Sequence, residues 1–231
     1  MKIGIFDSGI GGTTIMNAIK SELRTADYFY LADSKNCPYG EKSDTELLRI
    51  VIKNVDTLKA WGAQIIVVAC NTATVKCIKK LRQKYPEISF VGTEPAIKLA
   101  ASTNAKNILV LATPGTVQSE RAHQLKNTYQ KPNQNILLVP CPGLADTIEN
   151  TVQLTPDYQP IPLTKAARAL IDTKLSSLFE DITFSPDIIV LGCTHYSLIK
   201  KEIQKFFKNS IIIDGNTGVA HRVAGIYRSL K

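Results

Sequence analysis

The sequence predicts an α/β protein built from two pseudo-symmetric domains, each with its own parallel sheet. Nearly continuous apolar runs alternate with stretches of helical periodicity, which is typical of parallel strands covered by helices on both faces. Internal sequence similarity indicates two halves, because the similar segments "IGIFDSGIGGTT" (3–14) and "ILVLATPGTVQS" (108–119) each begin a set of such elements. Ligands of these folds bind beyond the carboxyl ends of the strands. We therefore expect the active site in the cleft between the two domains.

The first set of elements runs to about residue 95. Ser43 is typical of a helix N-cap, and Gly62 of a helix C-terminus, around a long amphipathic stretch. We expect strands over 2–8, 27–33, 63–71 and 89–95, and helices over 11–23, 42–62 and 72–85.

The second set begins near residue 106 and contains a proline-rich loop over 151–163. We expect a strand and turn over 106–116, further strands over 135–143, 186–196 and 210–216, and helices over 117–130, 144–150, 164–180, 197–207 and 217–231. The expected domains are 1–97 plus 210–231, in which the last strand and helix return to the first domain, and 98–209.

The composition is that of a globular protein, with 231 residues, 44% hydrophobic and 21% charged. No apolar run approaches the ~20 residues of a membrane span, and the opening "MKIGIFDSGIGG" does not resemble a secretory signal, so we expect a cytoplasmic protein with no membrane partner. The net charge of +8 favours a lysine-rich solvated surface, since the lysines form no dense run. A nucleic-acid partner has only weak support from this charge.

Five cysteines, an odd number, argue against a disulfide framework. Their spacing to one another and to the three histidines is not that of a zinc site, so no metal is expected. The sequence also lacks a Walker-type loop and a pyridoxal-lysine context, and "GIGG" lacks the spacing of a dinucleotide fingerprint, so no cofactor is expected.

Two of the cysteines occupy matched contexts. "QIIVVACNT" (64–72) aligns with "DIIVLGCTH" (187–195), so Cys70 and Cys193 each follow an apolar strand. Two facing thiols suit inversion at a carbon, in which one thiolate removes a proton from one face and the other thiol returns a proton to the opposite face. Cys37, Cys77 and Cys141 lack this setting, and we interpret them as small hydrophobic residues.

Six motifs in order resemble the cofactor-independent glutamate racemases of the aspartate/glutamate racemase superfamily, over residues 3 to about 225. The motifs are "FDSGIGG" (6–12), "ADSKNCPYGEKS" (32–43), "CNTA" (70–73), "EPA" (94–96), "ATPGTVQS" (112–119) and "GCTHY" (192–196).

The resemblance implies a role for each matching residue. Cys70 would act on D-glutamate with assistance from Asp7, and Cys193 on L-glutamate with assistance from His195 and Glu149. Substrate carboxylates and ammonium would be held by Asp7, Ser8, Tyr39, Gly40, Asn71, Thr72, Thr194 and His195. The family also implies a homodimer and a role in supplying D-glutamate for peptidoglycan.

Three departures from the family pattern leave alternatives open. Ser197 stands where the family usually has proline, and "PGT" (114–116) and "DGN" (214–216) replace more typical runs. Racemisation of aspartate or of several acidic amino acids is one alternative. A non-catalytic regulator with a gyrase-type partner is another, and it predicts that function survives Cys70→Ala.

Overall fold

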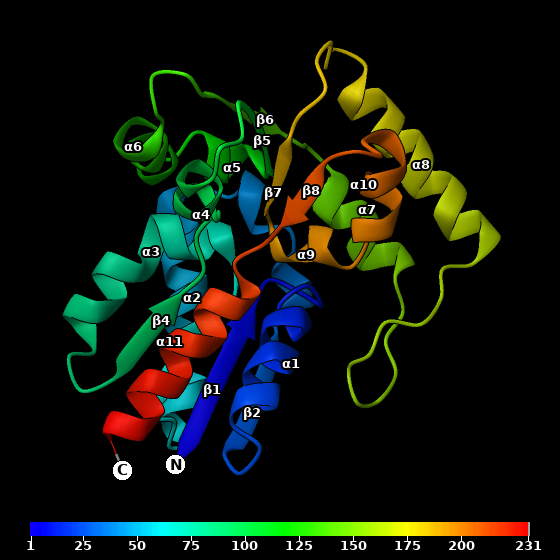
Figure 1. Cartoon of the computed structure of the whole chain (residues 1–231). Coiled ribbons are helices and arrows are strands. Elements are labelled where there is room, and N and C mark those ends of the chain that lie inside the picture. Colours follow the sequence, from blue (N-terminus) through cyan, green and yellow to red (C-terminus); the bar gives the residue numbers. More distant parts are fainter. Residues whose placement is uncertain (231) are drawn as a thin grey trace. The chain divides into compact units, whose positions relative to one another are not determined.

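The computed structural model describes residues 1–230 and divides the chain into two compact units. The first consists of residues 1–94 together with the described residues from 215 onward, and the second of residues 95–214. Both units are α/β, and each contains a four-stranded parallel sheet (Figure 1). This confirms the predicted fold class.

The first sheet has the strand order β2-β1-β3-β4. Its strands are β1 (Lys2–Asp7), β2 (Asp27–Ala32), β3 (Ile65–Val68) and β4 (Ser89–Gly92). Its helices are α1 (Thr13–Glu22), α2 (Asp44–Ala60), α3 (Asn71–Lys84) and α11 (Asn216–Ser229), with short 3-10 turns η1 (Ser34–Asn36) and η2 (Tyr39–Glu41).

Helix α2 shows how the sequence specifies an element of this unit. The Ser43 hydroxyl accepts a hydrogen bond from the Glu46 amide, which confirms the predicted N-cap, and Gly62 takes a positive φ of 93° just beyond the helix. Its buried side chains recur at helical spacing and pack in the core beneath β1 and β3. They are Leu47, Val51, Asn54, Val55 and Leu58.

The second sheet has the order β6-β5-β7-β8. Its strands are β5 (Asn107–Ala112), β6 (Asn135–Pro140), β7 (Ile188–Gly192) and β8 (Ile211–Ile213). Its helices are α4 (Ile97–Ser102), α5 (Pro114–Val117), α6 (Glu120–Tyr129), α7 (Leu144–Thr151), α8 (Lys165–Phe179), α9 (Thr194–Ser197) and α10 (Lys200–Phe206).

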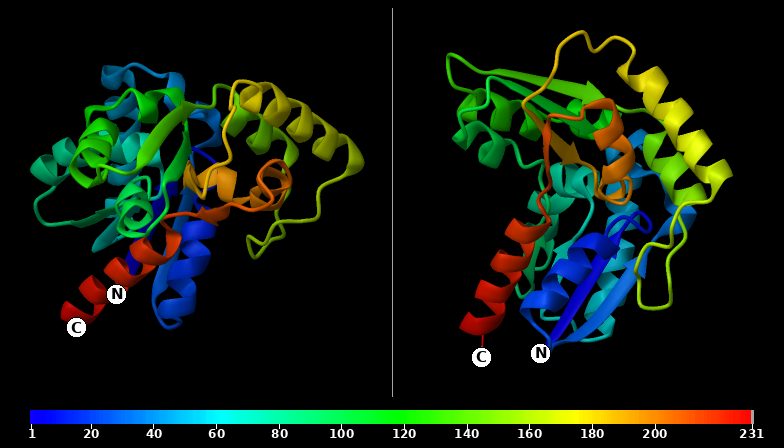
Figure 2. Two further views of the ribbon diagram at one scale, coloured as in Figure 1. Left: turned by 45° about the horizontal axis from the view of Figure 1, so that its top comes forward. Right: turned by 45° about the vertical axis from the view of Figure 1, so that its right-hand side comes forward.

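The structure corrects the expected domain boundary. The last strand, β8, pairs in parallel with β7 through Ile188↔Ile211, so it belongs to the second unit rather than to the first. Of the last strand and the last helix, only the helix, α11, lies in the first unit, where it runs beside α1 (Figure 2). Pairing gives β8 a neighbour for its backbone groups, and the chain crosses to the first unit only after Asp214.

Two further differences concern helices. Helix α4 was not expected, because its six residues are too few to show a periodic pattern, although Ile97 and Ala100 are buried. The helix expected over 197–207 corresponds to α10, whereas residues 194–196, expected as the end of a strand, form α9 together with Ser197. The expected last helix extends to residue 231, which lies outside the described residues. Among residues 1–230, no helix is both long enough and apolar enough to cross a membrane.

Candidate functional site

The two matched cysteines lie at equivalent places in the two sheets. Cys70 follows β3, and Cys193 follows β7, which is the third strand in its sheet order just as β3 is in the other. Each cysteine has extended backbone angles and immediately precedes a helix, α3 after Cys70 and α9 after Cys193. Both side chains are buried. The repeated sequence pattern around the two cysteines therefore corresponds to a repeated structural position, in which the cysteine follows a strand and is the N-cap of the next helix.

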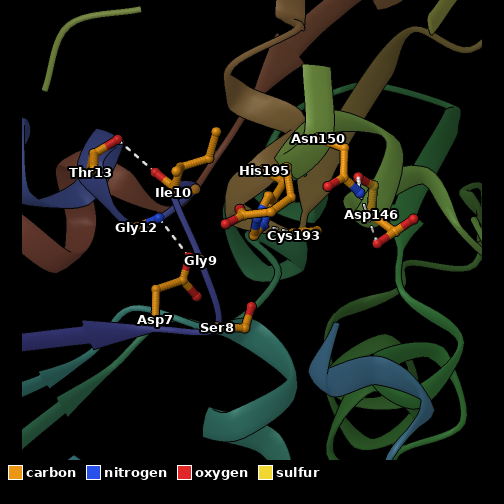
Figure 3. Close-up of polar contacts among 12 residues, drawn as sticks. Asp7, Ser8, Gly9, Ile10, Gly12, Thr13, Asp146, Asn150, Cys193 and His195 are labelled. Carbon is orange, nitrogen blue, oxygen red and sulfur yellow. Dashed lines mark hydrogen bonds and ion pairs between the residues drawn. The ribbon is translucent and has the colours of Figure 1, made fainter. Parts of the chain in front are cut away.

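Asp7 organises the glycine loop at the end of β1. Its buried carboxylate accepts a hydrogen bond at Oδ2 from the Gly12 amide, with an N···O distance of 2.6 Å (Figure 3). The Tyr30 hydroxyl donates to the Gly9 carbonyl at 2.5 Å. A methyl group at Gly12 would lie 2.7 Å from the Asp7 Cβ and 3.0 Å from the Ala69 Cβ, so only glycine fits there.

Ser8 and the first turn of α3 place polar groups beside Cys70. The Cys70 Sγ lies 4.0 Å from the Ser8 Oγ. Asn71 and Thr72, in the first turn of α3, are both buried. Within the described part of the chain, the Asn71 Oδ1 is buried without a hydrogen-bond partner. A buried amide oxygen in this state is suited to accept from a donor on a bound molecule, for example an ammonium.

Tyr39 does not offer its hydroxyl to a ligand. The side chain is 1% exposed, and its Oη donates to the Asp33 Oδ2 at 2.6 Å and accepts from the Asn54 Nδ2 at 2.9 Å. The expected contact of Tyr39 with a substrate is therefore restricted to its backbone. Gly40 follows in the same 3-10 turn, η2.

In the second unit a histidine and a glutamate accompany Cys193. The Cys193 Sγ lies 3.9 Å from the His195 Nδ1, and the His195 Nε2 lies 2.8 Å from the Glu149 Oε2. Because a glutamate carboxylate accepts hydrogen bonds, Nε2 is the protonated nitrogen in the neutral imidazole, and Nδ1 faces the thiol as an acceptor. Sequence reasoning selected all three residues, and the structure brings them together.

The position of α9 is fixed by its neighbours. Tyr196 is fully buried and donates from Oη to the Cys141 carbonyl at 3.3 Å, which ties α9 to the segment after β6. The hydroxyl of Ser197, which stands where the family usually has proline, donates to the Asp214 Oδ2 at 3.2 Å and so ties α9 to the end of the second unit. Thr194 is buried in the same short helix.

Two of the remaining thiols are held in their protonated form. Burial raises the pKa of Cys77 to about 11. Burial, and then the neighbouring Cys193, raise the pKa of Cys141 to about 12. A thiol with such a pKa is a poor nucleophile and a poor base at neutral pH, which agrees with their interpretation as small hydrophobic residues.

Sequence reasoning missed Tyr30, Asp33 and Asn54. A signal existed for Asn54, because it is a polar residue on the apolar stripe of α2 and a buried amide needs partners. Tyr30 and Asp33 gave no comparable signal, since an aromatic residue in a strand and an aspartate after one are both common.

Comparison with known proteins agrees with these observations. The family model described as Asp/Glu/Hydantoin racemase matches residues 3–222. A glutamate racemase of Sulfurovum sp. is 36% identical over 98% of this chain and 82% of its own length. One from Aliarcobacter butzleri is 37% identical over 98% of this chain and 84% of its own length.

Solved structures give the same result. A glutamate racemase from Escherichia coli, determined with L-glutamate and the activator UDP-MurNAc-Ala, is 29% identical and superimposes with a TM-score of 0.82 over 96% of this chain and 80% of that one. An aspartate racemase from Picrophilus torridus has a TM-score of 0.58 at 18% identity over 97% of this chain and 94% of that one, which shows a shared fold. This confirms the expected family and the expected class of enzyme: the chain belongs to the Asp/Glu/Hydantoin racemase family and is an isomerase.

Proposed function

We propose that this racemase interconverts L- and D-glutamate by a two-base mechanism that uses Cys70 and Cys193. The observation that carries the proposal is the equivalence of the two cysteines, each at the end of the third strand of its sheet and at the start of a helix. A single base would tend to return the proton to the face from which it came. Two acid/base groups of the same type serve both directions of an inversion equally.

The proton balance is simple. With D-glutamate, the Cys70 thiolate removes the α-proton and the Cys193 thiol delivers its own proton to the opposite face of the carbanion. With L-glutamate the roles reverse. Each turnover therefore begins and ends with one thiolate and one thiol. The enzyme then returns to its starting state by exchanging protons with water.

Neighbouring groups support each thiol. The imidazole of His195, oriented by Glu149, is placed to accept the proton of Cys193. Asp7, at the end of the strand beside β3, serves Cys70 in the same way. We assign substrate binding to Ser8, Asn71, Thr72 and Thr194, and to the backbone of Tyr39 and Gly40.

The preference for glutamate rests on the relatives. Those in the 36–37% identity range are named glutamate racemases, whereas the likeness to an aspartate racemase extends only to the fold. The product D-glutamate would supply peptidoglycan synthesis in the cytoplasm, with the enzyme acting as a homodimer.

Solvent deuterium exchange tests the proposal directly. The purified chain, with no cofactor added, is incubated in D₂O with each enantiomer of glutamate and of aspartate. We expect deuterium at the α-carbon of the enantiomer that forms, with a higher kcat/KM for glutamate. Exchange with aspartate alone would overturn the substrate assignment, and exchange with neither amino acid would overturn the proposed function.

Removal of each thiol tests the mechanism. Cys70→Ala and Cys193→Ala should each lower racemisation by at least about 10²-fold, the usual contribution of a positioned acid or base. Each variant should retain one-way elimination from one enantiomer of a substrate analogue with a leaving group, and the two should retain opposite enantiomers. Cys77→Ala is the matched control and should keep its activity. Full racemisation by either Cys70→Ala or Cys193→Ala would exclude the two-thiol mechanism.

A further inference from the structure

A closed polar network lies beneath the Tyr39–Gly40 turn. The Asn54 Nδ2 donates to the Tyr39 Oη at 2.9 Å and is 3.2 Å from the Asp33 Oδ2, which also receives the Tyr39 hydroxyl at 2.6 Å. The three side chains thus form a triangle of hydrogen bonds. Both the donor and the acceptor capacity of the phenol are used within the protein.

The network joins three separate elements. Asp33 follows β2, and its amide donates to the Asp7 carbonyl at 3.0 Å, at the end of β1. The other carboxylate oxygen, Oδ1, accepts from the Asn36 Nδ2 at 2.8 Å. Asn54 comes from the middle of α2, where it is buried. The turn that carries Tyr39 is therefore held by hydrogen bonds to Asp33, which follows a strand, and to Asn54, which lies in a helix.

The network also lies close to the residues assigned to catalysis. The η2 turn packs against α3, the helix that begins after Cys70. Burial, and then Asp33, raise the pKa of Tyr39 far above its usual value, and Cys70 and Asp7 add to the effect. The phenol therefore remains a hydrogen-bond donor at every pH at which the enzyme would work.

We infer that Asp33 and Asn54 are positioning residues for substrate binding: by fixing Tyr39, they hold the backbone of the Tyr39–Gly40 turn where it contacts the amino-acid substrate. The inference rests on the proposed function, because it assigns that turn to the substrate. Neither residue touches the reacting carbon or exchanges its proton. Loss of the network should therefore weaken substrate binding more than it slows the chemical step.

Two variants test the inference with little change in packing. Tyr39→Phe removes only the hydroxyl, and Asn54→Leu replaces the amide by an apolar group of similar size. In each we expect KM for glutamate to rise about 5- to 50-fold with kcat within about 3-fold of the wild type, the pattern of lost binding rather than lost catalysis. The two changes break the same network, so their effects should not be independent. The fold increase in KM of the double variant should be smaller than the product of the fold increases of the two single variants.

A second tyrosine–aspartate pair provides the matched control. The Tyr85 hydroxyl donates to the Asp56 Oδ1 at 2.6 Å, Tyr85 is 4% exposed, and Asp56 belongs to α2 as Asn54 does. Tyr85→Phe removes the same kind of bond away from the turn. It should lower the midpoint of thermal unfolding by no more than Tyr39→Phe does, because it removes one of these hydrogen bonds rather than two, and it should leave KM unchanged.

The outcomes separate the inference from the proposed function. If the wild type racemises glutamate and folded Tyr39→Phe and Asn54→Leu keep KM within about 2-fold, the network is structural only and the inference is wrong. An equal rise in KM for Tyr85→Phe would also overturn it. If the wild type racemises neither glutamate nor aspartate, the proposed function is wrong, and the inference falls with it.

Discussion

Gly12 is the residue at which the packing beside Asp7 leaves no space for a side chain. Gly12→Ala would place a methyl group 2.7 Å from the Asp7 Cβ and 2.9 Å from the Tyr30 Oη, so these neighbours must move. We expect a loss of about 1–3 kcal/mol in the free energy of unfolding, the usual cost of overpacking. Urea unfolding followed by circular dichroism measures it.

Gly225 provides the opposite case. It lies in α11, and a methyl group there would meet nothing within 4 Å. Because alanine is a better helix former than glycine, Gly225→Ala should raise the free energy of unfolding by up to about 1 kcal/mol. Equal effects of the two substitutions would contradict the account of Gly12 as a position set by close approach.

Predictability from sequence differed from residue to residue. Cys70 and Cys193 could be selected because a strand followed by a thiol and small polar residues occurs twice. Glu149 was selected only through the resemblance, and the structure places it 2.8 Å from His195. Asp33 and Asn54 could not be selected, because the hydrogen bonds that join Asn54 to Asp33 and to Tyr39 connect residues that are distant in the sequence and become neighbours only in the fold.

At the scale of elements, Asp187 fastens the start of β7 to β5. Its carboxylate accepts from the amides of Asn107 and Lys106 at 2.9 and 2.8 Å, and these bonds lower its pKa below the usual value. A carboxylate with a lowered folded pKa stabilises the fold above its unfolded pKa of about 3.9, and this stabilisation disappears as the pH falls through the folded value.

Asp187→Asn should therefore cost up to about 1 kcal/mol of unfolding free energy at pH 7, a small value because the side chain is exposed. The difference from the wild type should shrink once the pH falls below about 4. Urea unfolding at pH 7, 5 and 3.5 measures it, with exposed Asp27→Asn as the control. A difference that stays constant over this range would show that the charge is not responsible.

Most elements followed from local pattern, and the exceptions have physical causes. The strands β1, β3, β5 and β7 are buried apolar runs and were predictable. The assignment of β8 to a sheet was not, because its three residues can pair with any exposed strand edge. Only the tertiary structure shows that it extends the sheet beside β7.

At the scale of the whole molecule, the first unit is discontinuous. Residues 1–94 supply its sheet and three of its long helices, and α11 packs against α1 and β4 from the far end of the chain. The buried side chains of α11 include Val219, Val223 and Tyr227. Without α11, the surface that these side chains cover would be open to water.

We therefore expect residues 1–94 alone to lack cooperative unfolding. Joining residue 94 to residue 215 by a short glycine–serine linker should restore it. A short linker suffices because a methyl group at Gly215 would lie 3.3 Å from the Glu94 carbonyl oxygen. Urea titrations of the two chains, followed by circular dichroism, make the comparison. If the linked chain unfolded as non-cooperatively as residues 1–94 alone, α11 would not be what completes this unit.

The late position of α11 has a consequence for synthesis on the ribosome. Residues 1–94 are synthesised first, but α11, which belongs to the same unit, is synthesised only after the whole of the segment 95–214. A product of interrupted translation would thus carry Cys70 on an unfinished scaffold. Loss of the codons for α11 would leave the first unit without one of its helices, so quality-control proteases would meet an incompletely folded unit.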